Sequence, residues 1–298
     1  MKYIIDNDEE LIRLDKYLID KLGLSRSKVQ EMIRQKLVLV NNKNTKNSYV
    51  LKMNDIIDVI GELKEETDAK AEEMNLDIVY EDDDLMVINK PSGLVVHPAA
   101  GHFTGTLVNG LLFHTNSLSD NNGDLRPGIV HRIGKDTSAL IVVAKNDYTH
   151  EFLAKLLKDK TLSRVYLALV KGRIEHDTGT IDAPIGRDLN DRKKMCVTEV
   201  NSKEAITHFK VLERYKNATL LEVRLETGRT HQIRVHMAYI NHPVINDPVY
   251  LSSKATSFGQ MLHAKEISFV HPRTNEKMTF SCDAPKEFYE ILDKYRNE

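Results

Sequence analysis

The chain has 298 residues, of which 41% are hydrophobic and 29% are charged, and its formal net charge is −2. This composition is typical of a globular protein with a sizeable core, and the length allows two domains. No apolar run approaches the roughly 20 residues that cross a bilayer, and the N-terminus becomes acidic too early for a secretory signal. We therefore expect a cytoplasmic protein with no membrane partner. Cys196 and Cys282 are too few for a disulfide framework, and the twelve histidines lack the spacing of metal ligands.

Positive charge is concentrated near the N-terminus. Between Ser25 and Lys46 there are six Lys or Arg residues and a single acidic residue, whereas residues 61–84 contain eleven Asp or Glu and two Lys. Residues 61–74 are polar and acidic and lack aromatic groups, which is typical of a linker. We predict a small domain over residues 1–60, an acidic linker over 61–76 and a larger domain over 77–298.

The small domain is predicted to contain two helices followed by two strands. Apolar residues at 11, 14, 18 and 22 have helical spacing, and Gly23 suits the end of that helix. Ser25 suits the N-cap of a second helix, with Val29, Met32 and Ile33 turned inward. Residues 37–40 and 55–60 are predicted strands. Basic groups around a helix N-terminus and a nearby turn favour contact with RNA phosphates, although a solvated helix face is the alternative. The candidates are Arg26, Lys28, Arg34 and Lys43.

The larger domain alternates short strands with helices. Strands are predicted over residues 78–80, 85–89, 94–98, 141–144, 165–170 and 221–226, and helices over 106–114 and 148–160. A further helix follows Gly228, with a buried stripe formed by Ile233, Met237 and Ile240. Polar loops at strand ends are common places for functional groups.

The polar loop over residues 128–140 carries the most informative motif. Residues 131–140 of this loop are His-Arg-Ile-Gly-Lys-Asp-Thr-Ser-Ala-Leu. They resemble His-Arg-Leu-Asp-x-x-Thr-Ser-Gly-Leu, the central motif of the RluA/RluD-type RNA pseudouridine synthases. Residues His131, Arg132, Thr137, Ser138 and Leu140 match that motif. Ile133 and Ala139 are mild changes, but Gly134 stands where the family has its catalytic aspartate.

Other stretches extend the resemblance over almost the whole chain. Residues 89–98, Asn-Lys-Pro-Ser-Gly-Leu-Val-Val-His-Pro, are similar to the family's first motif, and 226–237, Glu-Thr-Gly-Arg-Thr-His-Gln-Ile-Arg-Val-His-Met, to its third. Tyr166 lies in a Tyr-x-Ala motif. Residues 13–15, 24–27 and 37–41 resemble an S4 RNA-binding domain, with Lys36, Asn42 and Asn54 at positions where that domain often has glycine.

The resemblance implies an α+β fold, with an S4-like domain before a catalytic domain built on a mixed, mainly antiparallel sheet flanked by helices. It implies an isomerase that converts uridine to pseudouridine in structured RNA, in particular large-subunit ribosomal RNA, as a monomer without cofactor or metal. Arg132 would fill the gap left by the flipped uridine, Tyr166 would stack on the uracil and assist proton removal from C5, and Arg234 would pair with the aspartate. The other implied RNA contacts are His131, Arg229, His231 and Gln232.

Gly134 leaves an alternative open, because glycine has no oxygen that can attack carbon or accept a proton. Asp136 is the nearest possible substitute. Without the family's carboxylate, we expect Arg234 to lack a partner unless Asp136, water or a phosphate reaches it. The alternative function is a catalytically impaired RNA-binding relative with a role in ribosome assembly. A small-molecule hydrolase is a third class, but no nucleophile–base spacing supports it.

Overall fold

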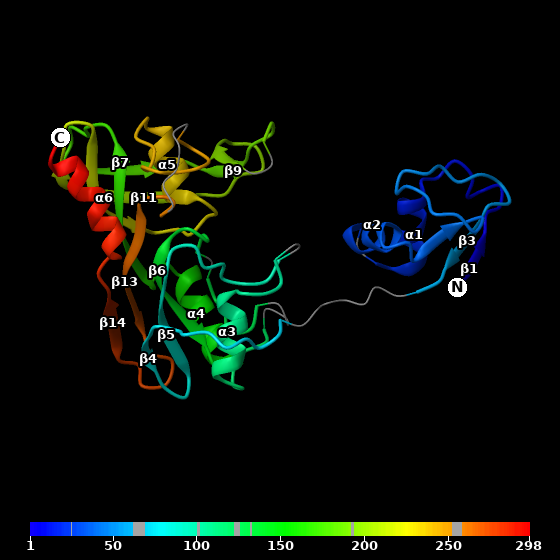
Figure 1. Ribbon diagram of the computed structural model, residues 1–298, viewed down its shortest axis with the longest axis horizontal. Coiled ribbons are helices and arrows are strands. Elements are labelled where there is room, and N and C mark those ends of the chain that lie inside the picture. Colours follow the sequence, from blue (N-terminus) through cyan, green and yellow to red (C-terminus); the bar gives the residue numbers. More distant parts are fainter. Residues whose placement is uncertain are drawn as a thin grey trace. The chain divides into compact units, whose positions relative to one another are not determined.

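The computed structural model describes residues 1–24, 26–61, 69–99, 102–121, 126–131, 133–191, 194–251 and 258–298. The chain divides into two compact units, Met1–Glu66 and Thr67–Glu298 (Figure 1). Within the ranges just given, no helix is both long and apolar enough to cross a membrane.

The first unit packs two helices against a three-stranded antiparallel sheet. The helices are α1 (Leu14–Leu22) and α2 (Arg26–Arg34), and the strands β1 (Lys2–Ile4), β2 (Val38–Val40) and β3 (Ile56–Val59) lie in the order β1-β3-β2. Gly23 ends α1 with φ 65°, as predicted. The predicted start at residue 11 is wrong, because Leu11 is exposed and has φ 67°, outside the helical region.

The buried face of α2 is confirmed, since Val29, Met32 and Ile33 all lie in the core of this unit. The predicted N-cap Ser25 lies outside the described residues. Lys36, Asn42 and Asn54, the positions where S4 domains often have glycine, all have positive φ. Asparagine tolerates this conformation well, whereas Lys36 adopts it at some cost in backbone strain.

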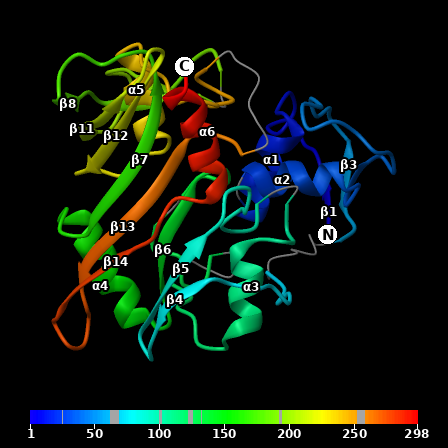
Figure 2. The same cartoon turned by 60° about the vertical axis from the view of Figure 1, so that its left-hand side comes forward.

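The second unit is built on a nine-stranded sheet, in the order β4-β5-β6-β13-β7-β12-β11-β8, with β14 paired to β13. Figure 2 shows β7 and β13 running side by side through its centre. Of the described strand pairs in this sheet, β6 with β13 is parallel and the others are antiparallel. The elements are β4 (Ile78–Glu81), β5 (Leu85–Lys90), α3 (Leu107–His114), β6 (Ser138–Ala144), α4 (Asp147–Lys158), β7 (Ser163–Lys171), β8 (Thr178–Asp182), β9 (Ile185–Arg187), β10 (Met195–Val197), β11 (Ile206–Arg214), β12 (Ala218–Leu225), α5 (Gln232–Tyr239), β13 (Leu262–Val270), β14 (Lys277–Ser281) and α6 (Lys286–Arg296).

Helices cover both faces of this sheet, as the α+β prediction requires. Alternate residues of β6 point to opposite faces. Ile141 and Val143 pack with Leu111 of α3, whereas Val142 packs with Leu153 of α4. A third core lies where β7, β12 and β13 meet α5 and α6. The mixed, mainly antiparallel sheet is therefore confirmed.

Two predictions for the start of the second unit are wrong. The predicted linker extends to residue 76, but Ala69 and Leu76 pack on the core beside α3, and the backbone N–H of Glu72 donates to Asn109 O at 3.0 Å. The shorter interval of residues 62–68 lies outside the described residues. The predicted strand over 94–98 is irregular, and the backbone N–H groups of α3's first residues donate to Val95 O and Val96 O.

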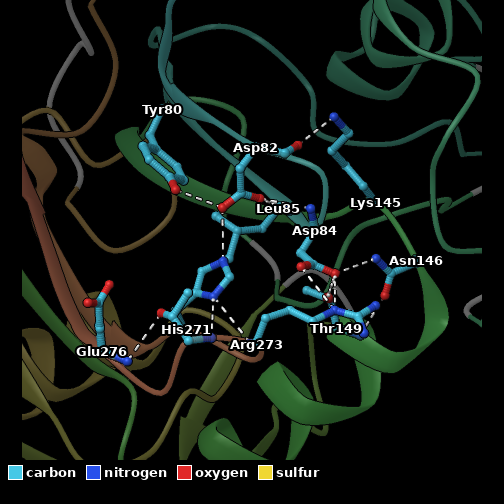
Figure 3. Close-up of polar contacts among 11 residues, drawn as sticks. Tyr80, Asp82, Asp84, Leu85, Lys145, Asn146, Thr149, His271, Arg273 and Glu276 are labelled. Atoms are coloured by element: carbon cyan, nitrogen blue, oxygen red, sulfur yellow. Dashed lines mark hydrogen bonds and ion pairs between the residues drawn. The ribbon is translucent and has the colours of Figure 1, made fainter.

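Within the acidic run at residues 81–84, the half-buried Asp82 and the buried Asp84 take part in a polar network, whereas Glu81 and Asp83 are exposed (Figure 3). The Asp82 carboxylate accepts hydrogen bonds from Tyr80 Oη at 2.7 Å and from the backbone N–H groups of Asp84 and Leu85, and it pairs with His271 at 2.9 Å. The hydrogen bond to Asp82 raises the pKa of Tyr80 to about 12. These contacts join the β4–β5 turn to the β13–β14 turn and stabilise that end of the sheet.

Candidate functional site

Residues of the central motif, of the Tyr-x-Ala motif and of the third motif meet in one pocket beside Gly134. Tyr166 lies on β7 between Val223 of β12 and Ala264 of β13 and is only 7% exposed. Arg234 lies in the first turns of α5 and is also 7% exposed. The described lining is Ile133, Gly134, Thr137, Tyr166, Leu225, Arg229, His231, Gln232, Ile233, Arg234, Gln260 and Leu262, and it contains no carboxylate.

Arg234 has a carboxylate partner, which corrects the prediction that its charge would be unpaired. Its Nε and Nη2 donate to the two oxygens of Asp247 at 2.6 and 2.8 Å. The backbone N–H groups of Val249 and Tyr250 also donate to Asp247. Burial opposes ionisation of Asp247, but the hydrogen bonds and charge of Arg234 outweigh it and lower the carboxyl pKa. The guanidinium is therefore fixed in place before any ligand binds.

The backbone at Gly134 does not require glycine. Its φ lies outside the left-handed region, and an added Cβ would be 3.6 Å from both Gln260 Nε2 and Thr137 Oγ1, which is ordinary van der Waals contact. A side chain at residue 134 would thus begin beside the pocket without displacing its neighbours. Gln260 Nε2 donates to Thr137 Oγ1 at 2.9 Å, and Gln260 is 2% exposed, so this part of the wall is rigid.

Asp136, the suggested substitute for the lost carboxylate, is half-buried outside this pocket. It is absent from the pocket's described lining. Gly259 lies close to it, since a Cβ added there would be 2.6 Å from Asp136 Cβ. Ser92 Oγ donates to the backbone carbonyl of Asp136 at 2.9 Å, which fixes the loop. The structure does not bring this carboxylate together with Tyr166 and Arg234.

Lys90 also fixes the loop that carries Gly134. This side chain is fully buried, and its Nζ donates to the carbonyl oxygens of Pro91, Leu94 and Lys135 at 2.8–3.0 Å. The backbone N–H of Gly93 also donates to Lys135 O. The first family-like motif therefore has a structural role here, which is to position the loop that carries Gly134.

His131 is buried at the start of the loop, where its Nε2 accepts a hydrogen bond from the Val142 backbone N–H at 3.2 Å. Burial and the positive charge of Arg164 lower the pKa of His131 to about 3, so the ring is neutral at pH 7. The predicted RNA contact Arg132 lies outside the described residues. His131 faces a second cavity next to Gly134, which Arg164 also lines.

The third motif forms the loop that leads into α5. Gln232 is buried, and its amide is fully used inside the protein: its oxygen accepts from Thr227 and Arg229, and its nitrogen donates to Ile206 O and Thr207 Oγ1. This bonding favours a positioning role for Gln232. Arg229 and His231 line both cavities. His231 has φ 58°, and burial lowers its pKa to about 4.

The basic candidates of the first unit lie on its surface. The side chains of Arg26 and Arg34 are 69% and 76% exposed, and Lys43 is exposed. Arg34 makes a bidentate pair with Glu31 at 2.9 and 2.6 Å, so part of its charge is balanced. The side chain of Lys28 lies outside the described residues.

Three residues of the site were not identified from the sequence. Lys90 lies in the first family-like motif and Asp247 follows α5, but only the structure shows that they contact Lys135 O and Arg234. Arg164 could have been identified from the sequence, because it is a charged residue in a mainly apolar strand. It lies two positions before Tyr166 and must therefore point to the same face of the sheet as Tyr166.

Comparisons with known proteins agree with this geometry. Residues 84–239 match the model of the RNA pseudouridylate synthase family, and residues 12–57 match that of the S4 domain. The chain is 51% identical over 286 residues to an uncharacterized RNA pseudouridine synthase, YlyB, of Bacillus subtilis, covering 95% of this chain and 94% of that protein. It is 44% identical over 300 residues to the ribosomal large subunit pseudouridine synthase D of Neisseria meningitidis serogroup B, covering 96% of this chain and 79% of that protein.

The fold is also found among solved structures. Human RNA pseudouridylate synthase domain containing 1 superposes with a TM-score of 0.59 at 24% identity, covering 75% of this chain and 96% of that one. The fold and the pocket thus define an S4 domain joined to a pseudouridine synthase domain. The chain belongs to the RNA pseudouridine synthase family of isomerases.

Proposed function

We propose that the pocket beside Gly134 receives a uridine of structured RNA, the substrate on which a pseudouridine synthase acts. The observation that carries this proposal is the convergence of Gly134, Tyr166 and a rigidly paired Arg234 in one partly apolar pocket. A base must leave its stack to enter such a pocket, and this costs a few kcal/mol. An aromatic wall such as Tyr166 offsets part of that cost by stacking.

Large-subunit ribosomal RNA is the substrate class that we propose. The Neisseria meningitidis relative is named for that subunit and aligns with almost all of this chain, including the S4 domain. The exposed Arg26 and Lys43 of the first unit would contact RNA phosphates, which gives affinity but little sequence information. A ribosomal substrate implies that the chain works in the cytoplasm, and we propose that it does so as a monomer.

The isomerisation breaks the bond between C1′ and N1 of the uridine and forms one between C1′ and C5. A proton leaves C5 and N1 ends protonated, so no cofactor is consumed. Tyr166 and Arg234 both line the pocket, where Tyr166 would stack on the uracil and assist the proton transfer at C5 and Arg234 would stabilise negative charge. The remaining requirement is a carboxylate at the nucleoside, and Gly134 does not supply it.

RNA binding without turnover is the second candidate function, and Gly134 is the observation that favours it. Removing a catalytic nucleophile typically lowers kcat by factors on the order of 10⁴ to 10⁶. Because Asp136 lies outside the pocket, the described residues offer no carboxylate in its place. Such a chain would retain the fold and recognition surfaces of a synthase and would act as an RNA-binding factor.

Tritium release from RNA labelled at uridine C5 separates the two functions, because pseudouridine formation exchanges that hydrogen. Large-subunit ribosomal RNA transcripts are incubated with this chain and with the Gly134→Asp variant, and binding is measured in parallel. Tritium release by the Gly134→Asp variant supports the proposed pocket, and release by the unaltered chain would exclude the function of RNA binding without turnover. Failure of both proteins to bind RNA would overturn the proposed pocket.

A further inference from the structure

A second cavity of about 580 Å³ lies next to Gly134 and is basic. Its described lining includes Lys158, Arg164 and Arg229 and contains no acidic residue. Lys158 is exposed at the end of α4, whereas Arg164 is deep in the wall and only 9% exposed. The cavity therefore presents positive charge on one side of the proposed uridine pocket.

Two residues that line this cavity each carry a buried nitrogen without a hydrogen-bond partner in the described part of the chain. The first is His131 Nδ1. Because His131 Nε2 accepts from the Val142 backbone, the neutral ring carries its hydrogen on Nδ1 and can donate it. The second is Arg164 Nε, and the described salt bridges include none to Arg164. A buried guanidinium without a counter-charge is costly, which indicates an anionic ligand.

Gly228 allows Arg164 to occupy this position. A Cβ added to Gly228 would lie 2.9 Å from Arg164 Nη1 and 3.1 Å from Nη2, so a side chain there would displace the guanidinium. The guanidinium thus lies directly on the backbone of the loop that precedes α5. Tyr166, two residues further along β7, projects from the same face of the sheet into the uridine pocket. Because Arg164 and Tyr166 are two residues apart on β7, each lines one of the two neighbouring cavities.

We propose that Arg164 and His131 bind a phosphate of the RNA backbone adjacent to the uridine held beside Gly134. A guanidinium matches the geometry of phosphate oxygens, and a neutral imidazole N–H adds a donor without adding charge. This inference rests on the proposed function, since the RNA supplies the phosphate. The phosphate contact would hold the backbone while the base enters the neighbouring pocket.

The test uses the full chain and a ribosomal RNA stem-loop in which single phosphates around the uridine are replaced by neutral methylphosphonates. We expect one position at which the replacement raises Kd about 10- to 100-fold. In the Arg164→Gln variant the same replacement should have little further effect, because the charged partner is already gone. Arg164→Lys keeps the positive charge but lacks the planar guanidinium with its paired donors. This variant should retain part of the sensitivity to methylphosphonate replacement.

Arg224→Gln is the matched control, since Arg224 is exposed on β12 and pairs with Glu222. This variant should keep the full methylphosphonate effect. Tight RNA binding with no sensitive phosphate, or with a sensitive phosphate that Arg164→Gln leaves unchanged, would overturn the phosphate site while leaving the uridine pocket intact. A scan of the unaltered chain that finds no sensitive phosphate overturns the site without any variant, and Arg164→Lys tests the assignment to Arg164 if Arg164→Gln misfolds.

Inorganic phosphate distinguishes an RNA site from a site for the free anion. The ¹⁵N signals of the His131 ring report occupancy, and the unliganded protein should show the Nδ1–H tautomer. We expect weak binding of inorganic phosphate that the stem-loop displaces. Phosphate that remains bound at saturating stem-loop would contradict an RNA backbone contact.

Discussion

The guanidinium of Arg234 and the carboxylate of Asp247 form a buried bidentate ion pair, with N–O distances of 2.6 and 2.8 Å. The Arg234 side chain is 8% exposed and that of Asp247 is fully buried. The pair forms without any residue from the loop at Gly134. The absence of the family's aspartate therefore leaves the cationic wall of the proposed uridine pocket in place.

Replacing Asp247 by asparagine should destabilise the protein by about 3 kcal/mol, because Arg234 would become a buried charge without a counter-charge. Urea unfolding measures this loss. Asp293→Asn is the control, since Asp293 pairs with Arg296 on the surface of α6 and should change stability by less than about 0.5 kcal/mol. Equal effects of the two variants would show that the buried pair contributes no more than a surface pair.

Stability should fall as the pH drops from 6.5 to 4, because two buried histidines resist protonation. The folded-state pKa of His131 is lowered to about 3 and that of His231 to about 4, whereas unfolded histidine titrates near 6.5. In this window the unfolded chain binds more protons, so the free energy of unfolding decreases on acidification. His131→Gln should remove roughly 2 kcal/mol of the decrease. An unchanged slope in that variant would contradict a neutral, buried His131.

Replacing Lys90 by methionine should loosen the loop that carries Gly134. Three buried carbonyl groups would lose their donor, at a cost of about 3 kcal/mol. Hydrogen exchange at the Gly93 amide, which donates to Lys135 O, reports the loop directly and should accelerate. The Leu169 amide on β7 donates to Met261 O and is the control. Its exchange rate should change only by the amount that the change in global stability explains. Equal acceleration at both amides would show that Lys90 has no specific effect on the loop.

The hydroxyl of Tyr166 can be tested in the Gly134→Asp background. Tyr166→Phe keeps the aromatic wall of the pocket but removes the hydroxyl that we propose assists proton transfer. We expect kcat to fall about 100-fold while RNA affinity stays within a few-fold. Tyr215→Phe is the control, because Tyr215 Oη donates to Glu213 outside the pocket. An unchanged kcat in Tyr166→Phe would limit this residue to stacking.

Local sequence patterns predicted the elements that lie closest to the site. Leu221 and Val223 alternate with polar residues and form a half-buried strand, and Ile233 and Met237 form the buried stripe of α5. Strand β13 was not predicted, although its place between β6 and β7 determines where Tyr166 lies. That placement depends on pairings between distant segments, which periodicity within one segment does not encode.

The family-like motifs predicted which residues would meet, but not how their charges would be balanced. Asp247 is thirteen residues beyond Arg234, after the end of α5, and only the folded chain shows that it faces the guanidinium. Asp136 shows the opposite case, in which a residue near the site in sequence lies outside it in the structure. It is two residues from Gly134 but packs against Gly259. Buried partners of charged groups are therefore the part of the site that required the structure.

The most direct measurement is pseudouridine formation on unmodified large-subunit ribosomal RNA by this chain, by Gly134→Asp and by Gly134→Asn as the uncharged control. A Cβ fits at residue 134, so the two variants differ from each other only in the carboxylate. We expect turnover by Gly134→Asp and none by this chain or by Gly134→Asn, with similar RNA affinity for all three. Turnover by the unaltered chain, or RNA binding without turnover by Gly134→Asp, would contradict the view that Gly134 is the single missing part of this site.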